Sequence, residues 1–251
     1  MKSTLRTLVA LMAAATLLTA CGKKDAATET PQAPASLDPA QIKANAEKAA
    51  EASRVAALPQ PNPATPAGSY LTIDSGHQLM YLYYGISKLP LDTEKVASLI
   101  SNDFRSTQDQ FKRQDLLKVL EPRIKADVEK AAANRYFIWE ASGNLVEHYD
   151  FKDKKFPLKE GFWKGTGESY WSDNYEYKVS FNGDEKLRSF PVADEAVARQ
   201  IEDMLTKFQP MKMRIYAFAQ DVDMNSHVVK SRTVKLELLD AKGNVLTTTS
   251  L

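Results

Sequence analysis

The stretch Tyr136-Phe137-Ile138-Trp139-Glu140-Ala141-Ser142-Gly143-Asn144 decides the fold class of this chain, because the sequence pattern changes character there. Its first four residues favour a β-strand, and Ser142-Gly143-Asn144 is typical of a turn. In the preceding residues 74–128, apolar side chains instead recur at the spacing of a helix. We therefore expect a helical region to give way to a sheet near Arg135.

Three helices are predicted before this point. They follow Asp74, Asp92 and Thr107. The side-chain oxygens of these residues can accept hydrogen bonds from the free backbone N–H groups in the first turn of a helix. Pro122 should kink the third helix or begin a new one, since a proline ring clashes with the preceding turn. The cluster Asp74-Ser75-Gly76-His77 contains triad-type residues, but Asp74 as a helix cap accounts for it more simply.

The second half of the folded region predicts mainly strands joined by turns. Strand-like runs cover 175–181, 211–222 and 233–239, and a last strand ends at Leu251. One further helix should begin after Asp194, with an apolar face formed by Val197, Ile201, Leu205 and Phe208. Helices followed by hairpin-linked strands predict an α+β fold, with an N-terminal helical segment packed on a mostly antiparallel sheet and one further helix.

Residues 69–251 form one predicted domain, and the composition before it is different. Ala, Lys, Glu, Gln, Thr and Pro dominate residues 22–68, which contain almost no large apolar side chain. Such a segment cannot bury enough apolar surface to offset the entropy of ordering it. We expect 21–68 to be a solvated tether, helical in part from Asp38 to Leu58 and then extended through a proline-rich spacer.

The N-terminus carries the most specific motif in the chain. Two positive charges, Lys2 and Arg6, precede a short apolar run that ends in Leu18-Thr19-Ala20-Cys21. The run is too short to cross a bilayer, which needs about 20 apolar residues. This arrangement resembles the signal peptide and lipobox of bacterial lipoproteins, with residues 1–20 as the signal peptide.

That resemblance implies a place in the cell envelope. It implies cleavage before Cys21, lipidation of Cys21 with acyl chains such as palmitate, and a stable hold on the lipid bilayer, because two or three chains anchor better than one. In such lipoproteins an Asp after the cysteine favours the inner membrane, whereas this chain has Gly22. The expected location is therefore the outer membrane, facing the periplasm.

The folded region carries a second resemblance. The block Phe111-Lys112-Arg113-Gln114-Asp115-Leu116-Leu117 is similar to bacterial envelope proteins of an uncharacterised domain family. That resemblance covers residues 69–251 and implies no activity.

Charge and cysteine content narrow the set of partners. Without residues 1–20 the chain loses Lys2 and Arg6 and keeps 31 basic and 32 acidic side chains, a formal net charge of −1. A balanced charge gives no reason to expect nucleic acid as a partner. Because Cys21 is the only cysteine, no disulfide can form within one chain, so the domain must depend on its apolar core.

The sequence contains no established catalytic motif. It lacks a G-x-S-x-G elbow, an H-E-x-x-H zinc motif, a P-loop and a cysteine nucleophile, so we expect no enzyme activity, no metal and no cofactor. His77, His148 and His227 fall on separate predicted elements, which argues against a zinc site. The run Asp221-Val222-Asp223-Met224-Asn225 begins like a calcium loop but continues with Ser226 where that loop needs glycine, so a polar strand end or turn is the better interpretation.

One aromatic-rich stretch, 162–177, is the candidate binding surface. Trp163, Tyr170, Trp171 and Tyr175 lie in it among glycine, serine and asparagine. Flat rings with a polar edge suit binding surfaces, because they supply contact area at a low cost in entropy. The alternative interpretation is that these rings fill one end of the core, since aromatic side chains also dominate core packing.

These observations lead to one functional expectation and two alternatives. We expect a membrane-anchored, non-enzymatic module that binds or scaffolds an envelope protein or cell-wall glycan. The first alternative is a dedicated peptidoglycan-binding module that uses Trp163, Tyr170 and Trp171. The second is a hydrolase in which carboxylates such as Glu168 or Asp173 converge in one cleft.

Overall fold

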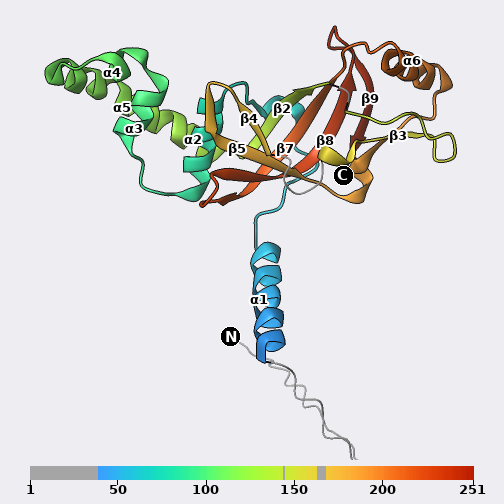
Figure 1. The fold of residues 1–251 in the computed structure, drawn as a ribbon, viewed down its shortest axis with the longest axis horizontal. Coiled ribbons are helices and arrows are strands. Elements are labelled where there is room, and N and C mark those ends of the chain that lie inside the picture. The colour runs from blue at the N-terminus through green and yellow to red at the C-terminus, as the bar shows by residue number, and fades with distance from the viewer. Residues whose placement is uncertain (1–38, 144, 163–167) are drawn as a thin grey trace, which may run out of the picture. The chain divides into compact units, whose positions relative to one another are not determined.

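The structure is a computed structural model that describes residues 39–143, 145–162 and 168–251, and Figure 1 shows its fold. The chain divides into two compact units, Met1–Glu51 and Ala52–Leu251. Helix α1 (Pro39–Ala56) begins in the first unit, and none of its residues is buried. The second unit contains the sheet, the other helices and the core, and it confirms the predicted α+β class.

Several predictions fall outside the described residues. The signal peptide, the lipidation site Cys21 and the expected helix cap Asp38 precede residue 39. Trp163 lies in the gap at 163–167. These stay predictions.

A seven-stranded sheet forms the body of the larger unit, with strand order β1-β2-β7-β8-β5-β4 and with β9 also paired to β8. Its strands are β1 (Leu71–Thr72), β2 (Tyr136–Ser142), β4 (Glu168–Trp171), β5 (Asn174–Asn182), β7 (Lys212–Asp223), β8 (Val228–Leu239) and β9 (Val245–Ser250). Within the described residues, four of its six pairings are antiparallel, and the parallel ones join β1 to β2 and β5 to β8. A second sheet pairs β3 (Lys155–Pro157) with β6 (Ser189–Pro191).

Helices gather at two ends of the large sheet. Figure 1 shows α2 to α5 together at one end and α6 at the other. Their bounds are α2 (Gly76–Ser87), α3 (Thr93–Ile100), α4 (Asn102–Ser106), α5 (Gln110–Ala133) and α6 (Glu195–Thr206). Asp92 and Asp194 cap α3 and α6 as predicted: the Asp92 side chain accepts a hydrogen bond from one backbone N–H of the first turn, and the Asp194 side chain accepts from two. Among the described helices, none combines the length and the apolar character needed to cross a bilayer.

The starts of two helices differ from the predictions. Ser75, rather than Asp74, caps α2 by accepting the N–H of Gln78 at 3.2 Å, and the Gln78 side chain accepts the Asp74 N–H at 2.8 Å. This pair resembles a capping box, except that Gln78 bonds the N–H of the residue before the cap, and the sequence pattern alone placed the cap one residue too early. The third predicted helix, α5, begins at Gln110 rather than near Thr107.

Two further positions correct the expected helix interiors. Pro122 begins no new helix, because α5 continues through it from Gln110 to Ala133. Phe208 lies beyond the end of α6 instead of on its apolar face, and its side chain is 88 % exposed. Its φ of 53° is in the left-handed region, which an aromatic residue rarely adopts.

The large sheet curls so strongly that rings from distant strands meet on one face. The ring centroid of Trp139 in β2 lies 5.1 Å from that of Trp171 in β4, although β7, β8 and β5 separate these strands in the sheet. Phe181 of β5 lies 6.0 Å from Trp139 and 6.3 Å from Phe137. This face is the core side of the sheet, since Phe137 and Phe181 are both buried.

Residues 59–70, which we call the strap, lie against the opposite face. Three hydrogen bonds hold the strap to the sheet: Gln220 Nε2 to the Pro59 carbonyl at 3.2 Å, Arg232 to Gln60 Oε1 at 2.9 Å, and the Asn62 N–H to the Tyr136 hydroxyl at 2.6 Å. The Tyr70 ring then packs edge-on against Tyr136 and Tyr216, at 5.2 Å from each. We predicted most of this segment as solvated spacer, whereas in the structure it contacts the sheet.

Candidate functional site

The β4–β5 hairpin contains the described part of the predicted aromatic surface. Tyr170 is 58 % exposed and Tyr175 is 74 % exposed, so both rings are open to solvent. Trp171 is half-buried against Trp139, and its indole nitrogen is buried without a hydrogen-bond partner in the described part of the chain. Two of these rings are therefore available to a ligand, while the third contributes to the core.

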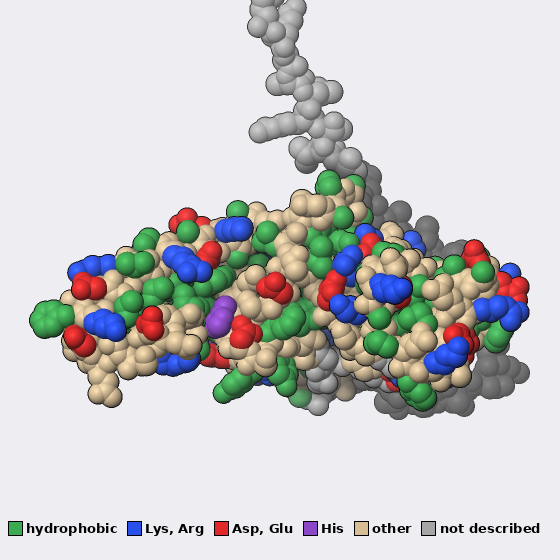
Figure 2. All heavy atoms as spheres, turned by 90° about the horizontal axis from the view of Figure 1, so that it is seen from above, with side chains coloured by type: hydrophobic (Ala, Val, Ile, Leu, Met, Phe, Trp, Pro, Cys, Tyr) green, Lys and Arg blue, Asp and Glu red, His purple; other side chains and the backbone are tan. Residues whose placement is uncertain are grey.

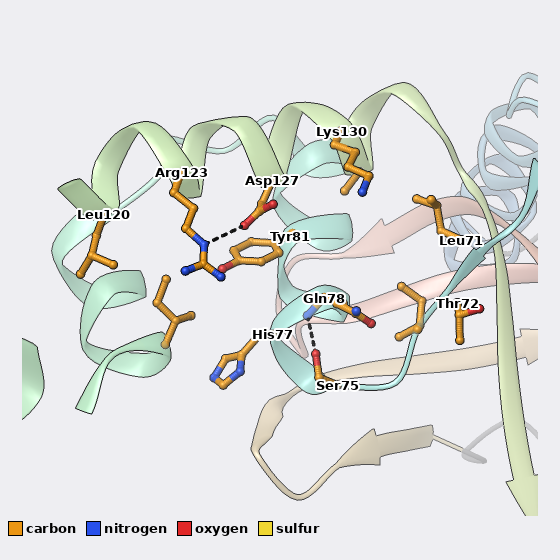
Figure 3. Close-up of a pocket in the computed structure, with 13 residues that line it drawn as sticks. Leu71, Thr72, Ser75, His77, Gln78, Tyr81, Leu120, Arg123, Asp127 and Lys130 are labelled. Carbon is orange, nitrogen blue, oxygen red and sulfur yellow. Dashed lines mark hydrogen bonds and ion pairs between the residues drawn. The ribbon is translucent and has the colours of Figure 1, made fainter. Parts of the chain in front are cut away.

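A cavity of about 560 Å³ opens at the helical end of the same unit. Its walls are mainly β1, α2 and α5, which Figure 3 shows, and Ile100 at the end of α3 adds to the lining. Cavities of roughly 300–1,000 Å³ are typical of ligand sites in proteins. The apolar part of the lining consists of Leu71, Ile73, Ile100, Leu120 and Ala131.

Charged groups reach this cavity from α5. Arg123 and Lys130 extend from α5 toward the cavity in Figure 3, and Asp127 lies between them, 4.0 Å from the Arg123 Nε. Tyr81 of α2 lies beside Arg123. Burial and the nearby Asp127 carboxylate raise the pKa of Tyr81, against the opposing effect of Arg123, so the phenol stays protonated and can donate a hydrogen bond.

His77 links the cavity to the tip of the β4–β5 hairpin. Its ring lines the cavity, its Nδ1 lies 3.1 Å from Asp173 Oδ2, and its Nε2 lies 3.1 Å from the Leu99 carbonyl oxygen. The other Asp173 oxygen accepts the Gly76 N–H at 2.9 Å. Both ring nitrogens thus face oxygen acceptors within the protein, an arrangement that orients His77 and leaves neither nitrogen directed at a ligand.

The carboxylates considered for hydrolysis have different partners. Glu168 accepts a hydrogen bond from Lys178 Nζ at 2.7 Å, whereas Asp173 contacts His77 and Gly76. Among the described residues no contact joins Glu168 to Asp173. The pair therefore gives no support to a two-carboxylate mechanism.

The histidines and the calcium-like run are also dispersed. His148 lies 2.5 Å from Glu202, and His227 lies 3.5 Å from Glu176. Asp223 is the last residue of β7, and a hydrogen bond from the Asn225 N–H lowers the pKa of its carboxyl group. Within the described ranges, no cluster of three or more His, Cys, Asp or Glu side chains is arranged to hold a metal ion.

The sequence predictions missed the cavity, although one signal was present. Leu120, Arg123, Asp127 and Lys130 recur at helical spacing on α5, so they share one face of that helix. A helix face that mixes one apolar and three charged residues resembles an ordinary solvated face. Only the approach of β1 and α2, which are distant in sequence, turns it into a cavity wall.

The fold and the site together define an α+β protein with a polar, partly cationic cavity at the helical end of a curled sheet. Figure 2 shows acidic and basic side chains interspersed over one face, in keeping with the balanced net charge. No protein-family model, no curated protein and no solved structure matches the chain. The family resemblances of the sequence therefore stay predictions.

Proposed function

We propose that this chain is a lipoprotein of the outer membrane, anchored through acylated Cys21, whose domain binds another envelope component and performs no chemistry. The anchoring part of the proposal rests on the resemblance of Leu18-Thr19-Ala20-Cys21 to a lipobox. A membrane anchor raises the local concentration of a binding domain, which benefits a weak binder most.

The observation that carries the binding part is the cavity between β1, α2 and α5. It has the volume of a ligand site and combines apolar walls with Arg123, Lys130 and the Tyr81 hydroxyl. His77, the group there best suited to proton transfer, is held by Asp173 and the Leu99 carbonyl. Such a lining favours recognition of a ligand over its conversion.

Binding of cell-wall glycan is the second candidate, and a separate observation favours it. Tyr170 and Tyr175 expose their rings on the β4–β5 hairpin, where they offer flat surfaces for sugar rings. Co-sedimentation with purified sacculi tests this version. It requires that Tyr170→Ala together with Tyr175→Ala abolish the association, while Phe151→Ala, at another exposed aromatic position, leaves it intact.

Photo-crosslinking in the intact envelope tests the main proposal. A photoreactive amino acid is placed at Lys130 on the cavity, at Tyr175 on the hairpin, or at exposed Phe151 as the control position. We expect one dominant adduct from Lys130 that is absent from Phe151. That adduct should disappear when Cys21→Ala releases the protein from the membrane.

Three results would change the conclusion. Muropeptide adducts from Tyr175, without any from Lys130, would favour the glycan candidate. An adduct that persists with Cys21→Ala would support binding but contradict its dependence on the membrane anchor. The absence of any position-specific adduct would contradict a binding function.

A further inference from the structure

Within the described part of the chain, no strand pairs with the outer edge of β1. This strand is the terminal strand in the sheet order and pairs with β2 on one side. The Ile73 N–H donates to the Ile138 carbonyl at 2.9 Å, so the backbone of Ile73 faces β2. Because alternate residues of a strand turn their backbone groups to opposite edges, Leu71 also faces β2 and Thr72 faces away from it.

The cavity lies along that outer edge. Leu71, Thr72 and Ile73 all line it, and Thr72 is exposed. An unpaired strand edge is a template for another strand, because its N–H and C=O groups can bond to an extended chain. A peptide laid beside β1 would pair with the Thr72 N–H and carbonyl and would lie next to the side chains of α2 and α5 that line the cavity.

The charge of the α5 wall indicates which side chains such a peptide carries. Arg123 and Lys130 supply two positive charges, and Asp127 supplies one negative charge that lies near Arg123. Lys130 forms no ion pair within the described residues, so its charge is available to a ligand. The wall therefore complements an acidic side chain, while Ile73, Leu120 and their apolar neighbours accept an apolar one.

We propose that the cavity binds an extended, acidic peptide segment of a partner protein, which adds to the outer edge of β1 as a further strand. This inference rests on the proposed binding function and names the partner as protein, recognised through its backbone and its carboxylates. Backbone pairing supplies the affinity, and the cations of α5 select the sequence.

A library of random peptides displayed on phage tests the proposal against the full chain. We expect enriched peptides to alternate apolar with Asp or Glu residues. Thr72→Pro removes the outward N–H without touching a sheet hydrogen bond, and proline is tolerated at such edge positions. The affinity for an enriched peptide should fall about five- to tenfold, the effect of one hydrogen bond.

Two matched controls isolate the backbone and charge contributions. Thr72→Ala keeps the N–H and loses only the side chain, so it should retain the affinity. Lys130→Glu should weaken binding of acidic peptides, whereas the same change at Lys125, which pairs with Glu121 on α5 and does not line the cavity, should leave it unchanged.

The outcomes separate this inference from the proposed function. Equal loss of affinity in Thr72→Pro and Thr72→Ala, or enrichment of basic peptides, would overturn strand addition to β1. Envelope adducts from Lys130 that consist of lipid or glycan would overturn the peptide ligand while keeping the binding function. Peptide selection that depends on Thr72 and Lys130, combined with no adducts in the envelope, would keep the peptide site and reject the envelope role.

Discussion

At Gly76 the first turn of α2 touches the tip of the β4–β5 hairpin, and the contact leaves no room for a side chain. A Cβ at this position would lie 2.6 Å from the Asn174 carbonyl oxygen and 2.8 Å from the Asn174 Cβ. The obstacle is partly backbone, so it cannot move aside as a flexible side chain would. Gly76 therefore sets how closely the hairpin and the cavity wall approach each other.

Gly76→Ala should destabilise the protein by about 1–3 kcal/mol, the usual cost of overpacking a close contact. Urea unfolding, followed by tryptophan fluorescence, measures the change as a lower midpoint. Gly68→Ala is the control, because a Cβ there meets no atom within 4 Å. An unchanged midpoint in Gly76→Ala would mean that the hairpin tip is free to move away from α2.

Asp240 organises the turn between β8 and β9 through three hydrogen bonds. Its Oδ1 accepts the Lys242 N–H at 2.8 Å and the Asn244 N–H at 2.9 Å, and its Oδ2 accepts from Asn244 Nδ2 at 2.8 Å. The bonds from Asn244, first of all the one from its side chain, lower the pKa of the Asp240 carboxyl group below 3.8. The charged form is thus the one that the folded turn prefers.

The lowered pKa of Asp240 predicts a pH-dependent contribution to stability. Because the folded pKa lies below the unfolded one, the contribution is complete above the ordinary value of 3.8 and is lost as the pH falls through the folded pKa. The difference in unfolding free energy between wild type and Asp240→Ala should therefore shrink on acidification from neutral pH. Urea titrations at several pH values measure it, with exposed Asp115→Ala as control, and a constant difference would contradict the prediction.

At the scale of single elements, α5 carries a proline that its structure does not require. Pro122 is exposed in the interior of the helix and supplies no N–H to the preceding turn. Pro122→Ala should stabilise the protein by about 1–3 kcal/mol, since alanine restores the donor and removes the ring clash. Thermal unfolding measures the gain, and exposed Gln114→Ala on the same helix should change stability by only a few tenths of a kcal/mol. A loss of stability would show that the proline shapes the cavity wall.

Strands β5 and β9 pair with successive segments of the same edge of β8, and Thr233 lies between the two segments. β5 pairs with residues 228–232 of β8, and β9 pairs with residues 235–239 on the same side. The Thr233 hydroxyl is buried at this junction and has no hydrogen-bond partner among the described residues. Burying a hydroxyl without a hydrogen bond costs free energy, so this side chain lowers the stability of the folded protein slightly.

Thr233→Val should raise the free energy of unfolding by about 1 kcal/mol, because valine has a similar shape and no polar atom to desolvate. The same substitution at exposed Thr248 of β9 should stay within about 0.5 kcal/mol of wild type. Chemical denaturation of both variants provides the measurement. A destabilised Thr233→Val would indicate that the hydroxyl bonds to a buried water.

Local sequence patterns predict some helices and strands of this protein but not the exposure of its aromatic rings or its cavity. Strands β2 and β7 and the caps Asp92 and Asp194 follow from local alternation and capping chemistry, so the sequence predicts them well. The exposure of Tyr175 and the half-burial of Trp171 do not follow, because they depend on a curl of the sheet that brings β4 opposite β2. The cavity likewise forms only because β1 lies close to α5, and the spacing of residues along the sequence does not predict that contact.

For the molecule as a whole, the start of the folded domain depends on whether the strap belongs to it. The compact unit starts at Ala52, and residues 59–70 bond to β2, β7 and β8 before α2 begins. A proline-rich segment loses little entropy on docking, since its backbone is already extended. We therefore expect the strap to behave as part of the domain during proteolysis.

Digestion with elastase, which cleaves after alanine, tests this expectation at Ala64 and Ala67 of the strap. Cleavage should occur first in α1, none of whose residues is buried, and the surviving fragment should retain residues 59–251. Tyr136→Phe removes the hydroxyl that accepts the Asn62 N–H at 2.6 Å, so the strap should open more often and cleavage at Ala64 should accelerate about five- to tenfold.

Tyr149→Phe is the matched control for that experiment. It also deletes a tyrosine hydroxyl bonded to backbone, here the Val192 carbonyl at 2.8 Å, but outside the strap. It should leave cleavage at Ala64 at the wild-type rate, since local opening depends on the contacts of the segment that opens. If Ala64 is cleaved as quickly as the alanines of α1 in the wild type, the strap is a spacer and the domain begins near residue 69. If both tyrosine variants accelerate cleavage equally, the strap opens with the whole domain.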